Sequence, residues 1–95
     1  MPSANDTLEL TGDDIIAVGS ALGTASRLRI IRLLQEEGPM MITEIAKKLN
    51  MTEANSSAQV KILEEVGIIK ADYEAGKHGL KKICSVQKNK IIFKL

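Results

Sequence analysis

The feature that most constrains the fold is a three-residue break between two segments whose apolar residues recur at helical spacing. The first segment ends at Leu49, and the second starts near Glu53. Between them, Asn50 tolerates the left-handed backbone that ends a helix, and Thr52 is a favourable N-cap for the helix that follows. The spacing is therefore that of a helix-turn-helix unit.

A helix is also predicted over residues 13–22, ahead of that unit. Thr11 and Asp14 resemble a capping arrangement at its start, with Asp in place of the usual Glu or Gln. One face of this helix carries Gly19 and Gly23 among other small side chains. Those small residues would let another helix approach closely, either from the same chain or from a second copy.

The next helix can be capped by Thr24 or Ser26 and stops at Gly38, because glycine suits the position after a helix end. It is apolar over a wide face, so we expect it to be central. After it, residues 40–42 are long enough only for a brief strand, and Thr43 can cap the helix that follows.

The apolar period changes beyond Gly67, from helical spacing to alternation. Residues 69–74 alternate as in a half-buried strand, residues 75–79 hold the glycines of a hairpin tip, and residues 80–86 can return antiparallel. Residues 90–95 alternate again and predict a terminal strand. The expected fold is mainly α with a small β wing: four helices, an antiparallel hairpin and a C-terminal strand.

The charges are unevenly distributed, although the net charge is only +1. Residues 1–26 carry four acidic side chains and no basic one, whereas residues 76–95 carry six lysines and no acid. A basic segment can meet a polyanion, but lysines can also solvate and protect a strand edge. The six lysines are Lys77, Lys81, Lys82, Lys88, Lys90 and Lys94.

At 95 residues the chain can form only one core, so we expect a flexible segment over residues 1–12 and one domain over residues 13–95. The amino-terminal stretch lacks the blocks of a signal peptide, and no apolar run approaches the roughly 20 residues that span a bilayer. Cys84 has no second cysteine with which to form a disulfide. These features predict a cytoplasmic protein without a membrane partner.

Three segments, residues 21–34, 42–52 and 60–69, resemble the arsenic-repressor (ArsR) family of dimeric transcriptional regulators. The resemblance implies a winged helix-turn-helix protein whose recognition helix lies in the major groove of duplex DNA. The wing would follow the DNA backbone or the minor groove. The resemblance also implies that two copies pair across the first helix and the carboxyl-terminal element.

The physics of duplex recognition agrees, because the major groove admits a helix whose first turns present polar groups to base edges. Asn55 and Gln59 can make bidentate contacts to adenine, although helical geometry places them on the flank of the exposed face. Lys61 is better placed for a phosphate. The expected DNA-binding residues are Thr52, Glu53, Asn55, Ser57, Gln59, Lys61, Lys77, His78, Lys81 and Lys82.

Two positions depart from the family pattern. Ser56 stands where the family usually buries an aliphatic side chain, and Ala58 stands where a longer polar side chain often reaches the DNA. Base reading is therefore expected to be modest, with affinity supplied in part by the wing. The expected dimer interface comprises Ile15, Gly19, Leu22, Gly23, Ile91 and Phe93.

Neither a metal cofactor nor catalysis is expected. Residues 40–44, which correspond to the cysteine-bearing helix of metal-sensing family members, hold no thiolate pair. One Cys and one His per chain cannot supply four metal ligands. Cys84 is expected in the core, and His78 lacks a partner that would orient it for catalysis. No cofactor is therefore predicted, and no motif identifies a small-molecule effector.

A second hypothesis is a winged helix used for protein interaction without specific DNA binding. Glu53 at the start of the recognition helix, the small residues along that helix and the near-neutral net charge favour this alternative. The lysine-rich last segment favours DNA. We therefore expect a homodimeric, sequence-specific regulator that binds duplex DNA, with the interaction module as the alternative.

Overall fold

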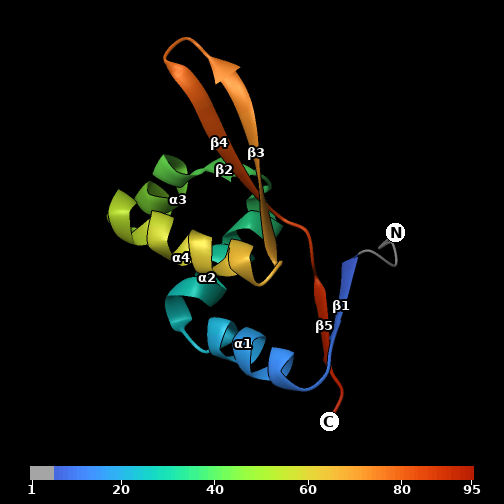
Figure 1. The fold of residues 1–95 in the computed structure, drawn as a ribbon. Coiled ribbons are helices and arrows are strands. Elements are labelled where there is room, and N and C mark those ends of the chain that lie inside the picture. The colour runs from blue at the N-terminus through green and yellow to red at the C-terminus, as the bar shows by residue number, and fades with distance from the viewer. Residues whose placement is uncertain (1–5) are drawn as a thin grey trace.

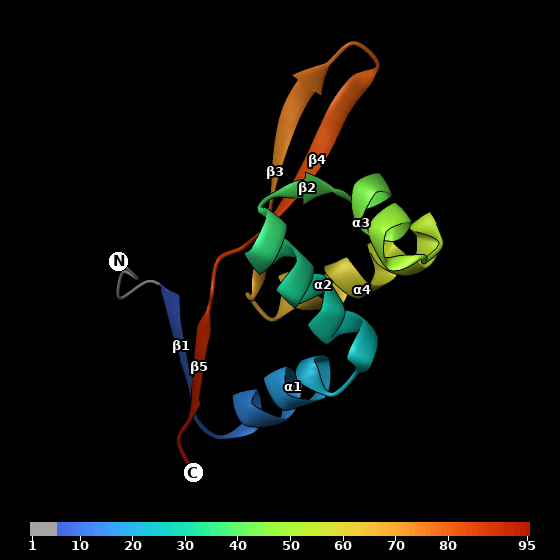
Figure 2. The same ribbon diagram turned by 180° about the vertical axis from the view of Figure 1, so that it is seen from behind.

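The computed structural model describes residues 6–95 and confirms a winged helix-turn-helix fold (Figure 1). The helices are α1 (Asp13–Leu22), α2 (Ala25–Glu37), α3 (Ile42–Leu49) and α4 (Glu53–Glu65). The strands are β1 (Thr7–Leu10), β2 (Met40–Met41), β3 (Ile69–Gly76), β4 (Gly79–Val86) and β5 (Lys90–Phe93). The hairpin of β3 and β4, called the wing below, and helix α1 lie at opposite ends of the molecule in both views (Figure 1, Figure 2).

Helix α2 lies at the centre of the helical part and contacts α1, α3, α4 and β4, as expected from its wide apolar face. Its fully buried Ile30 belongs to the same cluster as Ile45 of α3 and Leu63 of α4. Burying one such side chain stabilises a fold by roughly 1.5–3 kcal/mol. The two aromatic side chains, Tyr73 and Phe93, are exposed, so the core consists of aliphatic residues.

The helix ends confirm three of the expected signals. The Thr24 hydroxyl accepts a hydrogen bond from the backbone N–H of Arg27 at 3.4 Å, and the Thr52 hydroxyl accepts from the N–H of Asn55 at 3.1 Å. Asn50 adopts the left-handed conformation, with φ 54°. The turn between α3 and α4 is therefore formed by residues whose local chemistry suits it.

Two expected caps are wrong. Helix α1 starts after Gly12, whose φ of 60° is costly for other residues, and no side chain caps it, so Thr11 does not act there. Helix α3 starts directly after β2, which places Thr43 inside its first turn. The Glu44 carboxylate accepts from the backbone N–H of Met41 instead, at 3.4 Å. The strand that enters α3 decides where this helix begins.

The wing is an antiparallel pair whose register runs from Ile69 opposite Val86 to Gly76 opposite Gly79. The predicted hairpin is confirmed, and β2 extends it to a three-stranded sheet in the order β2-β4-β3. β2 covers only the base of β4, so the outer half of the wing extends away from the helices (Figure 1).

The expectation of a flexible segment over residues 1–12 is wrong for Thr7–Leu10, which form β1. β1 pairs in parallel with β5 in a separate two-stranded sheet, and Leu10 is buried in the core. The predicted C-terminal strand is therefore confirmed, but its neighbour is β1 and not the wing. Residues 1–5 of that segment lie outside the described residues.

Helices long and apolar enough to cross a membrane are absent from residues 6–95. The longest helices, α2 and α4, have 13 residues each. Their apolar residues are needed on the face that packs in the core.

Replacing Leu10 by Ala tests the terminal sheet. Because Leu10 is 6% exposed and packs against the core cluster, its truncation should lower the free energy of unfolding by about 2–4 kcal/mol. Urea denaturation measures the change. The neighbouring Thr11→Ala, at an exposed position that caps no helix, should stay within about 0.5 kcal/mol of wild type. Equal stability of the two variants would contradict a structural role for β1.

Candidate nucleic-acid interface

Helix α4, the predicted recognition helix, has a buried face and an exposed face. Ser56, Val60 and Leu63 are buried and hold α4 on the core. The side chains at the centre of the exposed face are small except at Lys61. The exposed residues from the N-cap to the end of α4 are Thr52, Glu53, Ala54, Asn55, Ser57, Ala58, Lys61 and Glu65.

Two of the predicted contact residues also serve the helix itself. Thr52 is the N-cap, and Glu53 is the first residue of α4. A carboxylate in the first turn interacts favourably with the partial positive charge of a helix N-terminus. The acidic start of α4 therefore has a structural reason that is independent of any partner.

Asn55 and Gln59 are joined to each other and to α2. The Gln59 side-chain amide donates to Asn55 Oδ1 at 3.1 Å, and Gln59 Oε1 accepts from Arg27 Nη1 at 2.7 Å. Asn55 is exposed, whereas Gln59 is only partly exposed. The two predicted base readers are thus brought together, but Gln59 is engaged within the protein. Sequence reasoning missed Arg27, whose partner lies 32 positions away.

Ser56 is fully buried, and its hydroxyl has no hydrogen-bond partner among residues 6–95. The structure thus places Ser56 on the buried face, in the position where the family resemblance implied an aliphatic side chain. A hydroxyl buried without a partner loses its hydration and gains nothing in return. The unsatisfied hydroxyl of Ser56 therefore lowers the stability of α4 on the core.

The predicted wing residues divide into two groups. Lys77, His78 and Lys81 are exposed, and none of them forms an ion pair within the described part of the chain. Lys82 instead forms an ion pair with Glu64 of α4, with 2.5 Å between Lys82 Nζ and Glu64 Oε1. Each of the two side chains is about one quarter exposed. The hydrogen bond to Glu64 holds the pKa of Lys82 above its usual value. This ion pair therefore links β4 of the wing to α4.

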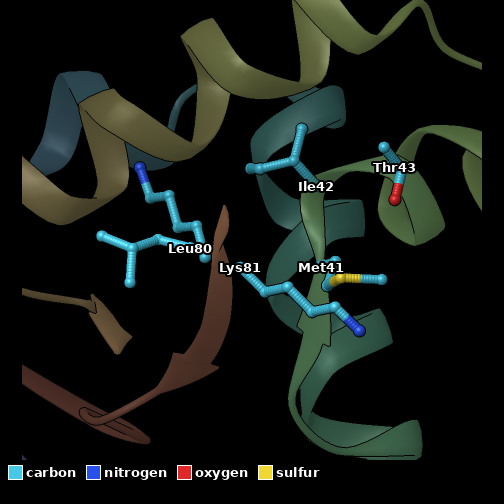
Figure 3. A pocket seen from close by; sticks show the side chains of 6 residues that line it. Met41, Ile42, Thr43, Leu80 and Lys81 are labelled. Carbon is cyan, nitrogen blue, oxygen red and sulfur yellow. The ribbon is translucent and has the colours of Figure 1, made fainter. Parts of the chain in front are cut away.

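A shallow hollow of about 230 Å³ lies between the wing and the start of α3. Figure 3 shows that Leu80 and Lys81 come from β4, while Met41, Ile42 and Thr43 form the opposite wall. β2 does not extend along β4 this far, so the edge of β4 is open here. The hollow has an apolar lining with lysine and threonine side chains at its border.

The six residues of the predicted dimer interface also divide into two groups. Three of them pack partly against the core of their own protomer: Ile15, Leu22 and Ile91. The other three are exposed: Gly19, Gly23 and Phe93. Sequence reasoning missed Ile16, which is 71% exposed. It shares a helical face with Gly19 and Gly23, and its neighbour Ile15 left the orientation of the pair ambiguous.

The titratable side chains do not gather into a metal site. Within residues 6–95, no group of three His, Cys, Asp or Glu side chains lies close enough to hold an ion. Cys84 is fully buried in the central strand β4, in agreement with its expected place in the core. Burial raises the pKa of its thiol, so the reactive thiolate form is disfavoured.

Comparison with known proteins agrees with this geometry. The family model of a helix-turn-helix domain matches residues 22–71, just over half of the chain, from the end of α1 into β3. The chain belongs to this helix-turn-helix family. Its members are defined by a helix-turn-helix domain and not by an enzymatic reaction.

One curated relative of this helix-turn-helix protein is an uncharacterised HTH-type transcriptional regulator from Methanocaldococcus jannaschii. The two are 37% identical over 54 residues, which cover 57% of this chain and 61% of the relative. The match therefore spans less than two thirds of the relative's length.

The fold is similar to that of solved structures. One is the homodimeric winged helix-turn-helix DNA-binding domain of a possible ArsR-family transcriptional regulator from Mycobacterium bovis, with a TM-score of 0.70, 28% identity and coverage of 79% of this chain and 65% of that one. Another is HlyU from Vibrio cholerae, with a TM-score of 0.67, 16% identity and coverage of 80% and 77%. The second similarity concerns the fold alone.

Replacing Ser56 by Ala should stabilise the protein, because it removes the buried hydroxyl without a partner. The free energy of unfolding should rise by about 1 kcal/mol in urea denaturation. Ser57→Ala is the matched control, since it makes the same change at an exposed position of the same helix and gains only helix propensity. A gain at Ser56 no larger than that at Ser57 would contradict the prediction.

Replacing Lys82 by Met should lower the free energy of unfolding by about 1 kcal/mol near neutral pH, because it breaks the partly buried pair with Glu64. Lys70→Met, which breaks a more exposed and longer pair with Asp72, should change stability less. The folded-state pKa of Lys82 is raised, so its contribution is complete below about pH 10.4 and is lost as the pH rises through that raised pKa. The difference between wild type and Lys82→Met should therefore persist at pH 8 and shrink as the pH rises through the raised pKa of Lys82.

Proposed function

We propose that this protein is a transcriptional regulator that binds duplex DNA sequence-specifically as a cytoplasmic homodimer. In this proposal α4 enters the major groove and the wing lies along the phosphate backbone. The observation that carries it is that Lys61 on α4, and Lys77 and Lys81 on the wing, are exposed and form no ion pair within residues 6–95. Such lysines can neutralise phosphates and release condensed counterions.

The exposed residues of α4 set the expected balance between affinity and specificity. Asn55 offers a polar amide near the start of the helix, whereas the centre of the exposed face carries Ala58 and Ser57. An alanine can contact a thymine methyl but forms no hydrogen bond with a base edge. The proposal is therefore a regulator whose phosphate contacts supply most of the affinity and whose base contacts are few.

The homodimer is supported by the exposed stripe of Ile16, Gly19 and Gly23 on α1. An apolar side chain beside two glycines offers a second helix both apolar surface and a close approach. The similar domain from Mycobacterium bovis is itself homodimeric. Pairing of two protomers would double the length of DNA that is read and would place two recognition helices about 34 Å apart. No cofactor takes part in this proposal.

One observation favours the alternative of a protein-interaction module. Leu80 is 74% exposed and Tyr73 is 61% exposed, and strand register places both on the same face of the wing. Exposed apolar side chains of this kind occur at protein contacts. The salt dependence of DNA binding discriminates between the two functions, because a module that only binds proteins has no phosphate contacts to lose.

The affinity for duplex DNA should fall steeply with salt concentration, and the double variant Lys77→Ala/Lys81→Ala should flatten this dependence. Each lost phosphate contact should reduce the logarithmic slope by about 0.9. Fluorescence anisotropy of a labelled duplex at several salt concentrations measures the slope. Lys94→Ala removes a lysine that is paired with Glu9 near the other end of the molecule, so it should leave the slope unchanged. If the double variant had the same salt dependence as Lys94→Ala, the proposed contact between the wing and the phosphate backbone would be wrong.

Gly19→Leu should weaken the homodimer without disturbing the protomer. A Cβ added at this exposed position would meet no atom within 4 Å beyond the adjoining turns of α1, whereas a leucine there would keep two α1 helices apart. Sedimentation equilibrium at micromolar concentration should give wild type near twice its chain mass of 10.3 kDa, and Gly19→Leu near that mass itself. Glu36→Leu, which places a leucine at an exposed position of α2, should remain dimeric. A monomeric wild type, both free and on DNA, would contradict the dimer.

A further inference from the structure

The side chain of Arg27 joins three helices. Its Nε donates to the Ala21 carbonyl at 2.5 Å, and its Nη2 donates to the Ser20 carbonyl at 3.1 Å, both in the last turn of α1. Its Nη1 donates to Gln59 Oε1 of α4 at 2.7 Å. Because the guanidinium is a rigid plane, these three bonds together fix its position and orientation.

Arg27 determines which groups donate and which accept in the hydrogen bonds from Arg27 to Gln59 and from Gln59 to Asn55. A guanidinium only donates, so the amide oxygen of Gln59 must face it and the amide nitrogen of Gln59 must face elsewhere. That nitrogen donates to Asn55 Oδ1. The oxygen of Asn55 is thereby turned toward Gln59, and Nδ2 is the end of the Asn55 amide that has no partner among residues 6–95.

We infer that Arg27 is a positioning residue for base recognition by Asn55, and that Gln59 transmits this effect and does not itself read a base. The inference rests on the proposed function, because it assigns roles within the DNA-binding helix. A bidentate contact to adenine needs both polar atoms of an amide, and each polar atom of Gln59 already forms one hydrogen bond inside the protein that fixes the orientation of the amide away from a free choice of base.

The consequence for specificity concerns the amide orientation of Asn55. An exposed asparagine without a fixed neighbour can turn either its oxygen or its nitrogen outward. Fixing Oδ1 toward Gln59 leaves Nδ2 as the outward donor, so the base that Asn55 meets must offer an acceptor, such as a purine N7. Arg27 therefore affects which base is preferred, although it lies on another helix.

The test is selection of bound duplexes from a random pool. Asn55→Ala identifies the position that Asn55 reads, where discrimination should fall roughly 2- to 13-fold, as expected for the loss of one hydrogen bond. Arg27→Ala and Gln59→Leu should each reduce discrimination at that same position by at least about twofold. The double variant Arg27→Ala/Asn55→Ala should discriminate no worse than Asn55→Ala, because Arg27 acts there only through Asn55.

Arg29→Ala is the matched control. It removes the same charge from the same helix, but Arg29 is exposed and makes no side-chain hydrogen bond or ion pair within residues 6–95. Its preferred motif should equal that of wild type. Thermal denaturation establishes that each variant is folded, and Gln59→Leu leaves the bonds from Arg27 to α1 intact should Arg27→Ala unfold.

Each outcome has a separate meaning. Loss of preference at the Asn55 position in Arg27→Ala and Gln59→Leu, with no further loss in the double variant, supports the inference. A wild type with a clear motif that both single variants leave unchanged overturns the positioning role alone. A wild type that selects no duplex overturns the proposed function and this inference with it.

Discussion

The packing of the other helices against α2 is the constraint on which the rest of the structure depends. α2 contacts α1, α3, α4 and the central wing strand β4, and its buried side chains are aliphatic. Aliphatic side chains have no polar atoms to satisfy, so their shape alone determines how neighbours fit. A helix fixed in this way also fixes its polar side chains. Arg27 at its start can therefore reach both the end of α1 and the middle of α4.

The same packing limits which charges are available to a partner. The lysine-rich last segment suggested six cations for a polyanion, but Lys82 is paired with Glu64 and Lys94 with Glu9. An ion pair of this kind holds two elements together and does not add a free positive charge. The exposed cations of the candidate interface are concentrated on the wing tip and on Lys61 of α4. The number of lysines in a sequence is therefore an upper bound on the number that are free to contact phosphates.

Helix α4 combines a pre-organised polar group with a buried hydroxyl that has no hydrogen-bond partner among residues 6–95. Asn55 is held by hydrogen bonds that extend to α2, whereas Ser56, its neighbour in the chain, is buried with no partner for its hydroxyl among residues 6–95. The first arrangement favours selectivity, and the second lowers the stability of the same helix. Proteins commonly retain such costs close to the residues that carry function.

The sequence by itself determined features that depend on a few neighbouring residues: the helix-turn-helix spacing at Asn50, the cap at Thr52, the alternation of the wing and the buried position of Cys84. A cap or a turn needs partners no more than a few positions away, so its signal is local. Only the tertiary structure decided the parallel pairing of β1 with β5, the pairing of Lys82 with Glu64, and the bond from Arg27 to Gln59. These contacts join residues distant in the chain. Apolar periodicity shows which face of an element is buried, but not which element covers it.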